Sequence, residues 1–175
     1  DSEEWLRIAS IAHQCGLPSN ATMLYGHIEN SEEKVYHLTR LREVQDETSG
    51  FLAYIPLSFH PERTELEHLP MPSGCLDLKE IAIGRLMLDN FDHIKTFWIM
   101  NTIEISQTAL WYGADDIDGT VMDYEITRRS FEETEQRLTQ REFLDRIEEA
   151  GRVALERDSL YNTVNSSVSN LAVGA

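Results

Sequence analysis

Residues 20–57, NATMLYGHIENSEEKVYHLTRLREVQDETSGFLAYIPL, decide the fold class of this chain. The runs at 20–25 and 51–57 are short and rich in residues that favour strands. Between them, Asn30 and Glu33 have the spacing of a helix capping box. Apolar residues then recur three and four positions apart, at Val35, Leu38, Leu41 and Val44. A strand, a helix and a second strand of these lengths predict a βαβ unit with parallel strands.

The same alternation continues through the rest of the chain. We expect further helices at Asp1–Cys15, Leu78–Phe91 and Ile103–Tyr112, a strand at Ile94–Met100, a short strand or turn at Asp115–Thr120, and a last helix opened by Thr139 and Glu142. Asp77 and Glu80 have the spacing to open the helix at 78–91. Four such units are half of a closed α/β barrel, which takes roughly 250 residues. The predicted fold class is therefore α/β: the C-terminal half of a (β/α)8 TIM-type barrel with a helical C-terminal extension.

The chain divides into three predicted parts. Residues 1–125 form the half-barrel of about four βα units, residues 126–164 the helical extension, and residues 165–175 a loose tail of small and polar residues. Within the half-barrel, Ser58–Cys75 is a long irregular stretch, and loops of that length are often functional.

The charge balance excludes several classes of function. Acidic residues number 31 and basic residues 15, and the net charge of −16 repels a phosphate backbone, so no nucleic-acid partner is expected. No apolar run approaches the ~20 residues of a membrane span, and no secretory leader opens the sequence. Cys15 and Cys75 lie far apart and belong to no CxxC pattern, which indicates reduced thiols in a cytoplasmic protein.

Histidines and carboxylates follow the predicted strands, at the ends where a barrel of this class carries its active site. His27 follows the first strand, His60 the second, and the acidic run 115–120 the last. Each also has a structural interpretation: His27 as a helix-entry residue, His60 as a loop anchor, and the acidic run as an Asp-Gly turn. These residues with Glu29 could hold a divalent ion, but no H-x-H or H-E-x-x-H spacing supports one, so no metal ligand is expected.

Five segments resemble the radical S-adenosylmethionine enzymes of the futalosine route to menaquinone. They are GLPSNATMLYGHIE (16–29), LREVQDETSGFLAYIPLSFHP (41–61), IGRLMLDNFDHI (83–94), GADDIDGT (113–120) and ERDSLYN (156–162). Together they cover most of residues 1–128 and a shorter stretch near 151–164. His60 in SFHP is similar to the members that form aminofutalosine, whereas glutamine is expected there in the paralogous dehypoxanthine futalosine cyclase.

The resemblance implies an α/β barrel that binds S-adenosylmethionine as cofactor. Such enzymes share a loose G-x-I-x-G-x-x-E pattern on the fifth barrel strand, beside the adenosyl group. Here the pattern is Thr22-x-Leu24-x-Gly26-x-x-Glu29, with threonine in place of the first glycine. Glycine at 26 lets the backbone approach a nucleoside closely. The next strand would lie along the adenine, which adds Tyr54 and Ser58 as cofactor-binding candidates.

The implied substrate is a small molecule. A reduced [4Fe–4S] cluster would cleave S-adenosylmethionine, and the 5′-deoxyadenosyl radical would add to 3-[(1-carboxyvinyl)oxy]benzoate to give aminofutalosine. The protein would supply orientation and exclude water. His60 and His27 are the catalytic candidates, for proton handling or for binding the substrate carboxylates. Asp116, Asp118 and Thr120 are the substrate-binding candidates.

Departures from the family pattern restrict what this chain can do alone. The family holds its cluster with a C-x-x-x-C-x-x-C loop that this chain lacks, and Cys15 and Cys75 cannot replace three closely spaced thiolates. We therefore expect the C-terminal part of a longer protein, inactive as a separate chain. Residues 127–131 differ from the small, histidine- and glycine-bearing stretch expected there, and Arg63 stands where asparagine is usual.

Two other interpretations stay open. One is another radical enzyme of the superfamily, either the cyclase or a member of the deazaflavin-cofactor or thiamine pathways. The other is a non-catalytic acidic half-barrel. Such a module would form a homodimer through its exposed edges, because unpaired strand edges and apolar faces favour association.

Overall fold

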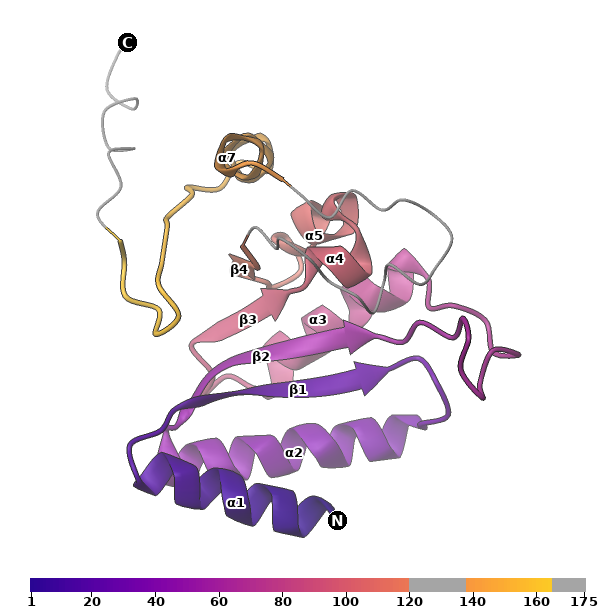
Figure 1. Ribbon diagram of the computed structural model, residues 1–175, viewed down its shortest axis with the longest axis vertical. Helices are drawn as coiled ribbons and strands as arrows, with labels where there is room; N and C mark the ends of the chain where they lie inside the picture. Colours follow the sequence, from indigo (N-terminus) through magenta and orange to yellow (C-terminus); the bar gives the residue numbers. More distant parts are fainter. Residues whose placement is uncertain (120–137, 165–175) are drawn as a thin grey trace.

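The computed structural model describes residues 1–119 and 138–164. In order, they form α1 (Ser2–Gln14), β1 (Ser19–Tyr25), α2 (Ser31–Thr48), β2 (Phe51–Ser58), α3 (Gly74–Met87), β3 (His93–Thr96), α4 (Trp98–Asn101), α5 (Ile103–Ala109), β4 (Asp116–Ile117) and α7 (Gln140–Glu149) (Figure 1). The predicted boundary at residue 125, the departing stretch 127–131 and the predicted tail 165–175 lie outside the described residues. None of the described helices is long and apolar enough to cross a membrane.

The strands form one sheet in the order β1-β2-β3-β4, and every neighbouring pair is parallel. This confirms the predicted α/β class, because parallel strands in sequence order need a helical crossover between each pair. The strand order is the one that half of a (β/α)8 barrel would have. The closed barrel itself stays a prediction.

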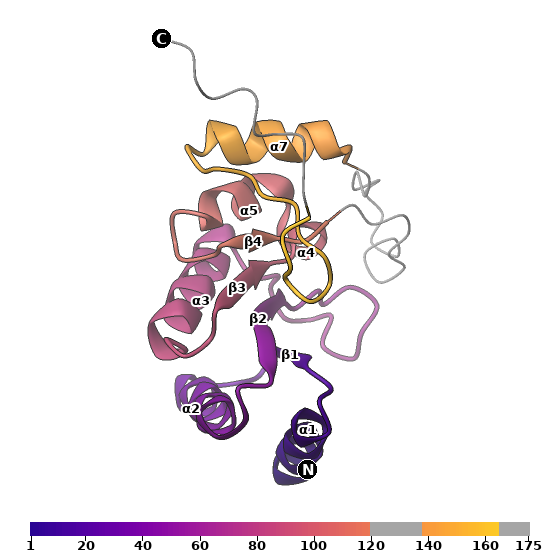
Figure 2. The ribbon, with the colours of Figure 1, turned by 90° about the vertical axis from the view of Figure 1, so that its left-hand side faces the viewer.

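The two faces of the sheet differ in what covers them. On one face, Ala21, Met23 and Tyr25 are buried against the apolar side of α2, which contributes Leu38 and Leu41. The alternate residues of β1 point the other way and are exposed, as period-two alternation requires. Figure 2 looks along the strands and shows α2 and α3 together on the covered side. We call the opposite side the open face.

The start of α3 differs from the prediction. The helix begins at Gly74, where the Ser73 side chain accepts a hydrogen bond from the Leu76 N–H, and it ends at Met87 rather than at Phe91. Asp77, the predicted cap, is buried inside the helix and bonds to a strand residue instead. Serine is a favoured N-cap residue, so the Ser73 side chain could fill this role without a capping box, while Asp77 bonds to the sheet.

The third strand is shorter than predicted. β3 ends at Thr96, and the end of the predicted strand forms α4. Phe97, Trp98 and Met100 are buried in a second apolar cluster that includes Phe143 of α7. Because Phe143 lies more than forty positions further along, no local pattern of β3 could predict this packing. The two capping boxes, at Asn30 and Thr139, are confirmed.

Candidate functional site

The turn after β1 is held by one carboxylate. Gly26 adopts a φ of +87°, a conformation that favours glycine. Glu29 Oε1 accepts the Gly26 N–H at 2.7 Å, and Oε2 accepts the His27 N–H at 2.9 Å. Burial alone would raise the pKa of Glu29, but these hydrogen bonds outweigh it and lower the pKa. The turn therefore holds an ionised carboxylate at the end of β1.

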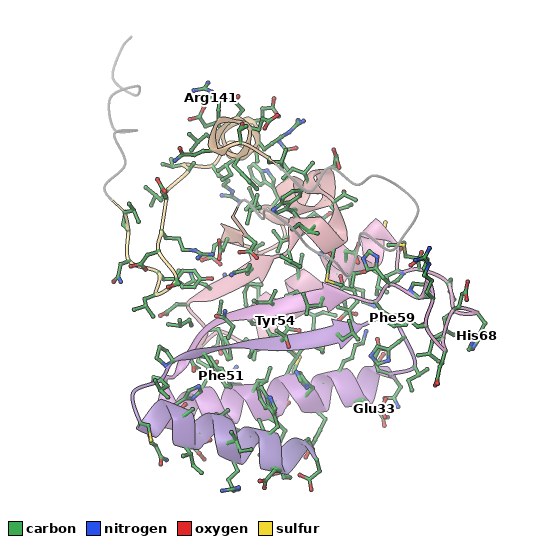
Figure 3. The ribbon with its side chains drawn as sticks, in the orientation of Figure 1. Glu33, Phe51, Tyr54, Phe59, His68 and Arg141 are labelled. Atoms are coloured by element: carbon green, nitrogen blue, oxygen red, sulfur yellow. The ribbon has the colours of Figure 1, made fainter. Side chains whose placement is uncertain are left out.

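His27 is bound into the same turn. Its Nδ1 accepts the Ile28 N–H at 2.7 Å, so the ring hydrogen lies on Nε2, which donates to the Leu24 carbonyl at 3.2 Å. The ring also meets Phe59 edge-on, with centroids 5.7 Å apart. Figure 3 labels Phe59 where β2 passes into the long loop. The catalytic role predicted for His27 requires its ring to leave these backbone bonds.

His60 ties the long loop to α4. Its Nε2 lies 3.1 Å from the Met100 carbonyl oxygen and donates to it. Among the described residues, no hydrogen bond involves Nδ1 of this ring. His60 is therefore oriented by one nitrogen while the other stays available at the carboxyl ends of the strands, which suits the proton-handling role that the sequence predicts.

A buried carboxylate behind the strand ends was missed by the sequence analysis. Asp77 Oδ1 accepts the Tyr25 hydroxyl at 2.7 Å and the Ser58 hydroxyl at 3.1 Å. Burial raises the pKa of Asp77, and both hydrogen bonds and the nearby His60 ring only partly oppose this. Tyr25 and Ser58 are direct partners in the β1–β2 ladder. The pairing of Tyr25 with Ser58 was the signal that could have suggested a common hydrogen-bond partner for their hydroxyl groups on α3.

The predicted cofactor-binding residues divide between the two faces. Thr22 and Leu24 are exposed on the open face, and Leu24 is 45% exposed. Tyr54 and Ser58 are buried on the covered face. The ring of Tyr54, which Figure 3 labels, packs against Gly84 of α3, and its hydroxyl has no hydrogen-bond partner among residues 1–119 and 138–164. A contact from Tyr54 or Ser58 to an adenine would therefore have to come from the backbone.

The acidic run after β3 is paired with the C-terminal segment. Asp116 Oδ2 accepts Arg157 Nη2 at 2.7 Å and the Tyr161 hydroxyl at 2.5 Å. Lys95 Nζ lies 3.8 Å from Asp116 and 3.4 Å from Asp118. Burial and the Asp116 carboxylate raise the pKa of Tyr161, so the phenol stays a donor. The third substrate-binding candidate, Thr120, lies outside the described residues.

A cavity of about 730 Å³ lies between β4 and the segment that follows α7. Three arginines line it, and each has a partner. Arg85 donates to the Gly113 carbonyl and to Asp115, Arg152 donates to the Leu110 carbonyl, and Arg157 donates to Asp116. Arg85 and Arg157 are therefore paired with carboxylates, whereas the exposed Arg152 has no carboxylate partner among the described residues.

The described residues do not fit an iron–sulfur cluster. A cluster needs several thiolate ligands close together. Cys15 and Cys75 are both exposed and belong to different elements, and no group of three or more potential metal ligands occurs in residues 1–119 and 138–164. Any cluster would have to be held by residues other than those described.

Comparison with known proteins gives the site its context. Residues 48–171 match the family described as the CofH/MqnC C-terminal region. The chain is 46% identical over 167 residues to aminodeoxyfutalosine synthase of Thermus thermophilus, covering 93% of this chain and 45% of that protein. It is 38% identical over 165 residues to 5-amino-6-(D-ribitylamino)uracil–L-tyrosine 4-hydroxyphenyl transferase of Methanoculleus marisnigri (92% and 45%). It is also 38% identical over 159 residues to cyclic dehypoxanthine futalosine synthase of Streptomyces coelicolor (91% and 39%). The chain spans less than half the length of each of these relatives.

Proposed function

The chain belongs to the CofH/MqnC family, and from this premise we propose that it is the C-terminal part of an aminodeoxyfutalosine synthase. The whole enzyme would use S-adenosylmethionine and a [4Fe–4S] cluster to convert 3-[(1-carboxyvinyl)oxy]benzoate into aminodeoxyfutalosine, the aminofutalosine of the futalosine route. The substrate would be a small molecule in a route to menaquinone.

One observation carries the choice among the related activities. The identity to an aminodeoxyfutalosine synthase is 46%, against 38% to each of the two relatives with other names. His60 supports the same choice, because glutamine is expected at this position in the cyclase. In the structure His60 presents one ring nitrogen near the strand ends, where a proton donor or a carboxylate ligand could act.

The chain's own residues would orient the ligands. When bound, S-adenosylmethionine supplies the adenosyl group that is transferred. Thr22 and Leu24 offer an exposed polar and apolar surface on β1. Gly26 permits the positive φ of the turn, but Pro72 of the long loop packs directly against it, so a nucleoside would have to contact the backbone on another side. Glu29 would act indirectly, because its oxygens are already bonded to the turn that it holds. The cluster would be held outside the described residues.

A chimeric enzyme tests this proposal. In it, this chain replaces the matching C-terminal part of the Thermus thermophilus synthase, which supplies the rest of the protein. Purified without oxygen, the chimera should contain about four iron atoms per chain. It should form aminodeoxyfutalosine from 3-[(1-carboxyvinyl)oxy]benzoate and S-adenosylmethionine, measured by mass spectrometry.

The same chimera is then offered the substrates of the two other relatives. Product from the dehypoxanthine futalosine or the tyrosine reaction, with none from the benzoate, would contradict the proposal. So would a chimera that carries its full iron and forms no product. The chain expressed alone provides the control, because it should bind no cluster and show no activity.

A further inference from the structure

The C-terminal segment places two side chains on the open face of the sheet. Arg157 and Tyr161 reach the same oxygen of Asp116, which lies 41 and 45 positions earlier in the sequence. The Asp116 side chain is only 9% exposed. Figure 2 shows this segment beside β3 and β4, on the side away from α2 and α3. Two donors on one buried carboxylate make a defined structure rather than a chance surface contact.

The local fold of the segment is built to present these two residues. Arg157 and Thr163 pair as an antiparallel bridge, and Asp158 accepts the N–H groups of Leu160 and Asn162. Tyr161 is held at a φ of +63°, a conformation that costs a non-glycine residue roughly 1–2 kcal/mol. Such strain persists only where surrounding contacts compensate for it.

Stacking supplies the compensating contacts. The Tyr161 ring lies on His93 of β3, with centroids 3.9 Å apart, and the Arg157 guanidinium lies 4.5 Å from the centre of the Tyr161 ring. The segment is therefore locked onto β3 and β4 by its aromatic ring as well as by its charge.

The network continues from Asp116 toward the strand ends. Lys95 projects between Asp116 and Asp118 and is only 8% exposed. Its contacts are long, at 3.8 and 3.4 Å, whereas Arg157 approaches Asp116 to 2.7 Å. Asp118 is 30% exposed, and its N–H donates to the carbonyl of Thr96, the last residue of β3. Arg157 is therefore the main counter-ion of Asp116, and Lys95 is only loosely engaged.

We propose that Arg157 and Tyr161 are positioning residues for Asp116, Arg157 by neutralising its charge and Tyr161 by donating a hydrogen bond to the same oxygen, so that the Lys95 ammonium can bind a carboxylate of the substrate. The inference rests on the proposed function, whose substrate carries two carboxylates. Without Arg157, the unpaired Asp116 carboxylate would form an ion pair with Lys95, the nearest other cation. The affinity of the Lys95 ammonium for an anionic ligand would then fall. Asp118 is the neighbour that a substrate carboxylate would displace, since it is part-exposed and its contact with Lys95 is long.

The test compares Michaelis constants in the chimeric synthase. Lys95→Met should raise the KM for 3-[(1-carboxyvinyl)oxy]benzoate by about tenfold or more, with the KM for S-adenosylmethionine and the iron content unchanged. Arg157→Met should raise the same KM by about tenfold, and Tyr161→Phe by about threefold. The matched controls are Arg141→Met and Tyr112→Phe, both at exposed positions.

Charge rescue separates positioning from simple structural support. If Arg157 acts by neutralising Asp116, then adding Asp116→Asn to the Arg157→Met variant should restore most of the lost affinity for the substrate. A structural role would leave the double variant as weak as the single one. Failure of this rescue, or a wild-type KM in Lys95→Met, overturns the proposal.

Direct binding keeps this result distinct from the proposed function. Calorimetric titration of each variant with 3-[(1-carboxyvinyl)oxy]benzoate gives the same comparison without turnover. A chimera that binds the compound but forms no product would contradict the proposed function, while the pattern among the variants would still decide the role of Arg157. A wild-type chimera that does not bind the compound would overturn both.

Discussion

Two carboxylates at the strand ends lie in opposite electrostatic environments. Glu29 faces two backbone N–H groups, which favour its ionised form and lower its pKa. Asp77 is buried behind the sheet, which raises its pKa although two hydroxyl groups donate to it. The free energy of unfolding should therefore depend on pH in opposite directions at these two residues.

At Glu29, the substitution Glu29→Gln should lower the free energy of unfolding by about 1–2 kcal/mol at pH 7, because an amide cannot accept both N–H groups. The folded-state pKa is lowered, so this carboxylate stabilises the fold above about pH 4.3, and the effect is lost as the pH falls through the folded-state pKa. Urea unfolding of both proteins at pH 7 and near pH 3 measures the difference. It should shrink in acid, whereas the exposed control Glu62→Gln should show little effect at either pH. A difference that is the same at both pH values would contradict this account.

At Asp77, the free energy of unfolding should depend on pH in the opposite direction. The folded-state pKa is raised, so the contribution of Asp77 is present below about pH 3.9 and is lost as the pH rises through the folded-state pKa. Asp77→Asn keeps an acceptor for Tyr25 and Ser58, and its stability relative to wild type should improve between pH 4 and pH 7. Asp77→Ala, which removes the acceptor, should cost about 2–3 kcal/mol near pH 4 and less near pH 7. Urea unfolding across this range is the measurement, and a stability gap between wild type and Asp77→Asn that does not change with pH would disprove the assignment.

Among the elements, those governed by local signals were predicted from the sequence. The capping boxes at Asn30 and Thr139 are confirmed because each is completed within four residues. The boundaries of α3 and β3 were wrong for the opposite reason. Asp77 has the sequence spacing of a helix cap, but its side chain bonds to a strand residue behind it. The run after Thr96 has the composition of a strand, but it packs against Phe143 and is helical.

The C-terminal end of α2 provides a test at the level of one element. Ser49 caps this helix with a φ of 49° and a ψ of 30°, the left-handed conformation that costs an L-residue roughly 1–2 kcal/mol. Ser49→Gly should raise the free energy of unfolding by about 0.5–1 kcal/mol, because part of the gain is offset by the greater freedom of glycine in the unfolded chain.

The control for this substitution lies in α1. Ser10→Gly places glycine inside an ordinary helix and should lower the free energy of unfolding by about 0.5–1 kcal/mol. A gain in the free energy of unfolding for Ser49→Gly and a loss for Ser10→Gly, measured by urea unfolding, would support a strained left-handed Ser49. A lower free energy of unfolding in both variants would mean that Ser49 is not strained.

For the whole molecule, the sequence predicted which strand ends carry the candidate residues, but not all of the contacts that these residues make. The parallel order of the strands could be predicted from their alternation with helices, and it brings His27 and His60 to one edge of the sheet. The partners of Asp116 could not be predicted, since Arg157 and Tyr161 are joined to it only by the path of the C-terminal segment. Within the acidic run, Asp116 is the buried member, with a side chain 9% exposed against 39% for Asp115 and 30% for Asp118, a distinction that spacing along the chain does not reveal.

The outer edge of the sheet determines whether the isolated chain should associate with a second copy. β1 lies at the end of the strand order, and its open-face residues Thr22 and Leu24 are exposed. No strand lies on the outer side of β1 among the described residues, and side chains of His37 and His27 bond the Thr22 and Leu24 carbonyls there. An edge strand with an exposed apolar side chain favours pairing with another strand. We therefore expect two copies of the isolated chain to associate through β1, and we expect a chimera that supplies the preceding part of a barrel to cover the same edge.

Sedimentation equilibrium of the isolated chain tests this expectation. The wild-type chain should show a concentration-dependent dimer, and Leu24→Lys should shift it to monomer, because a charge on the inward side of an edge strand opposes pairing. Ile28→Lys is the matched control, since Ile28 is 73% exposed but lies in the turn beyond the strand. A dimer that persists equally in Leu24→Lys would place the contact elsewhere, and a chain that stays monomeric at every concentration would show that the edge of β1 is protected without a partner.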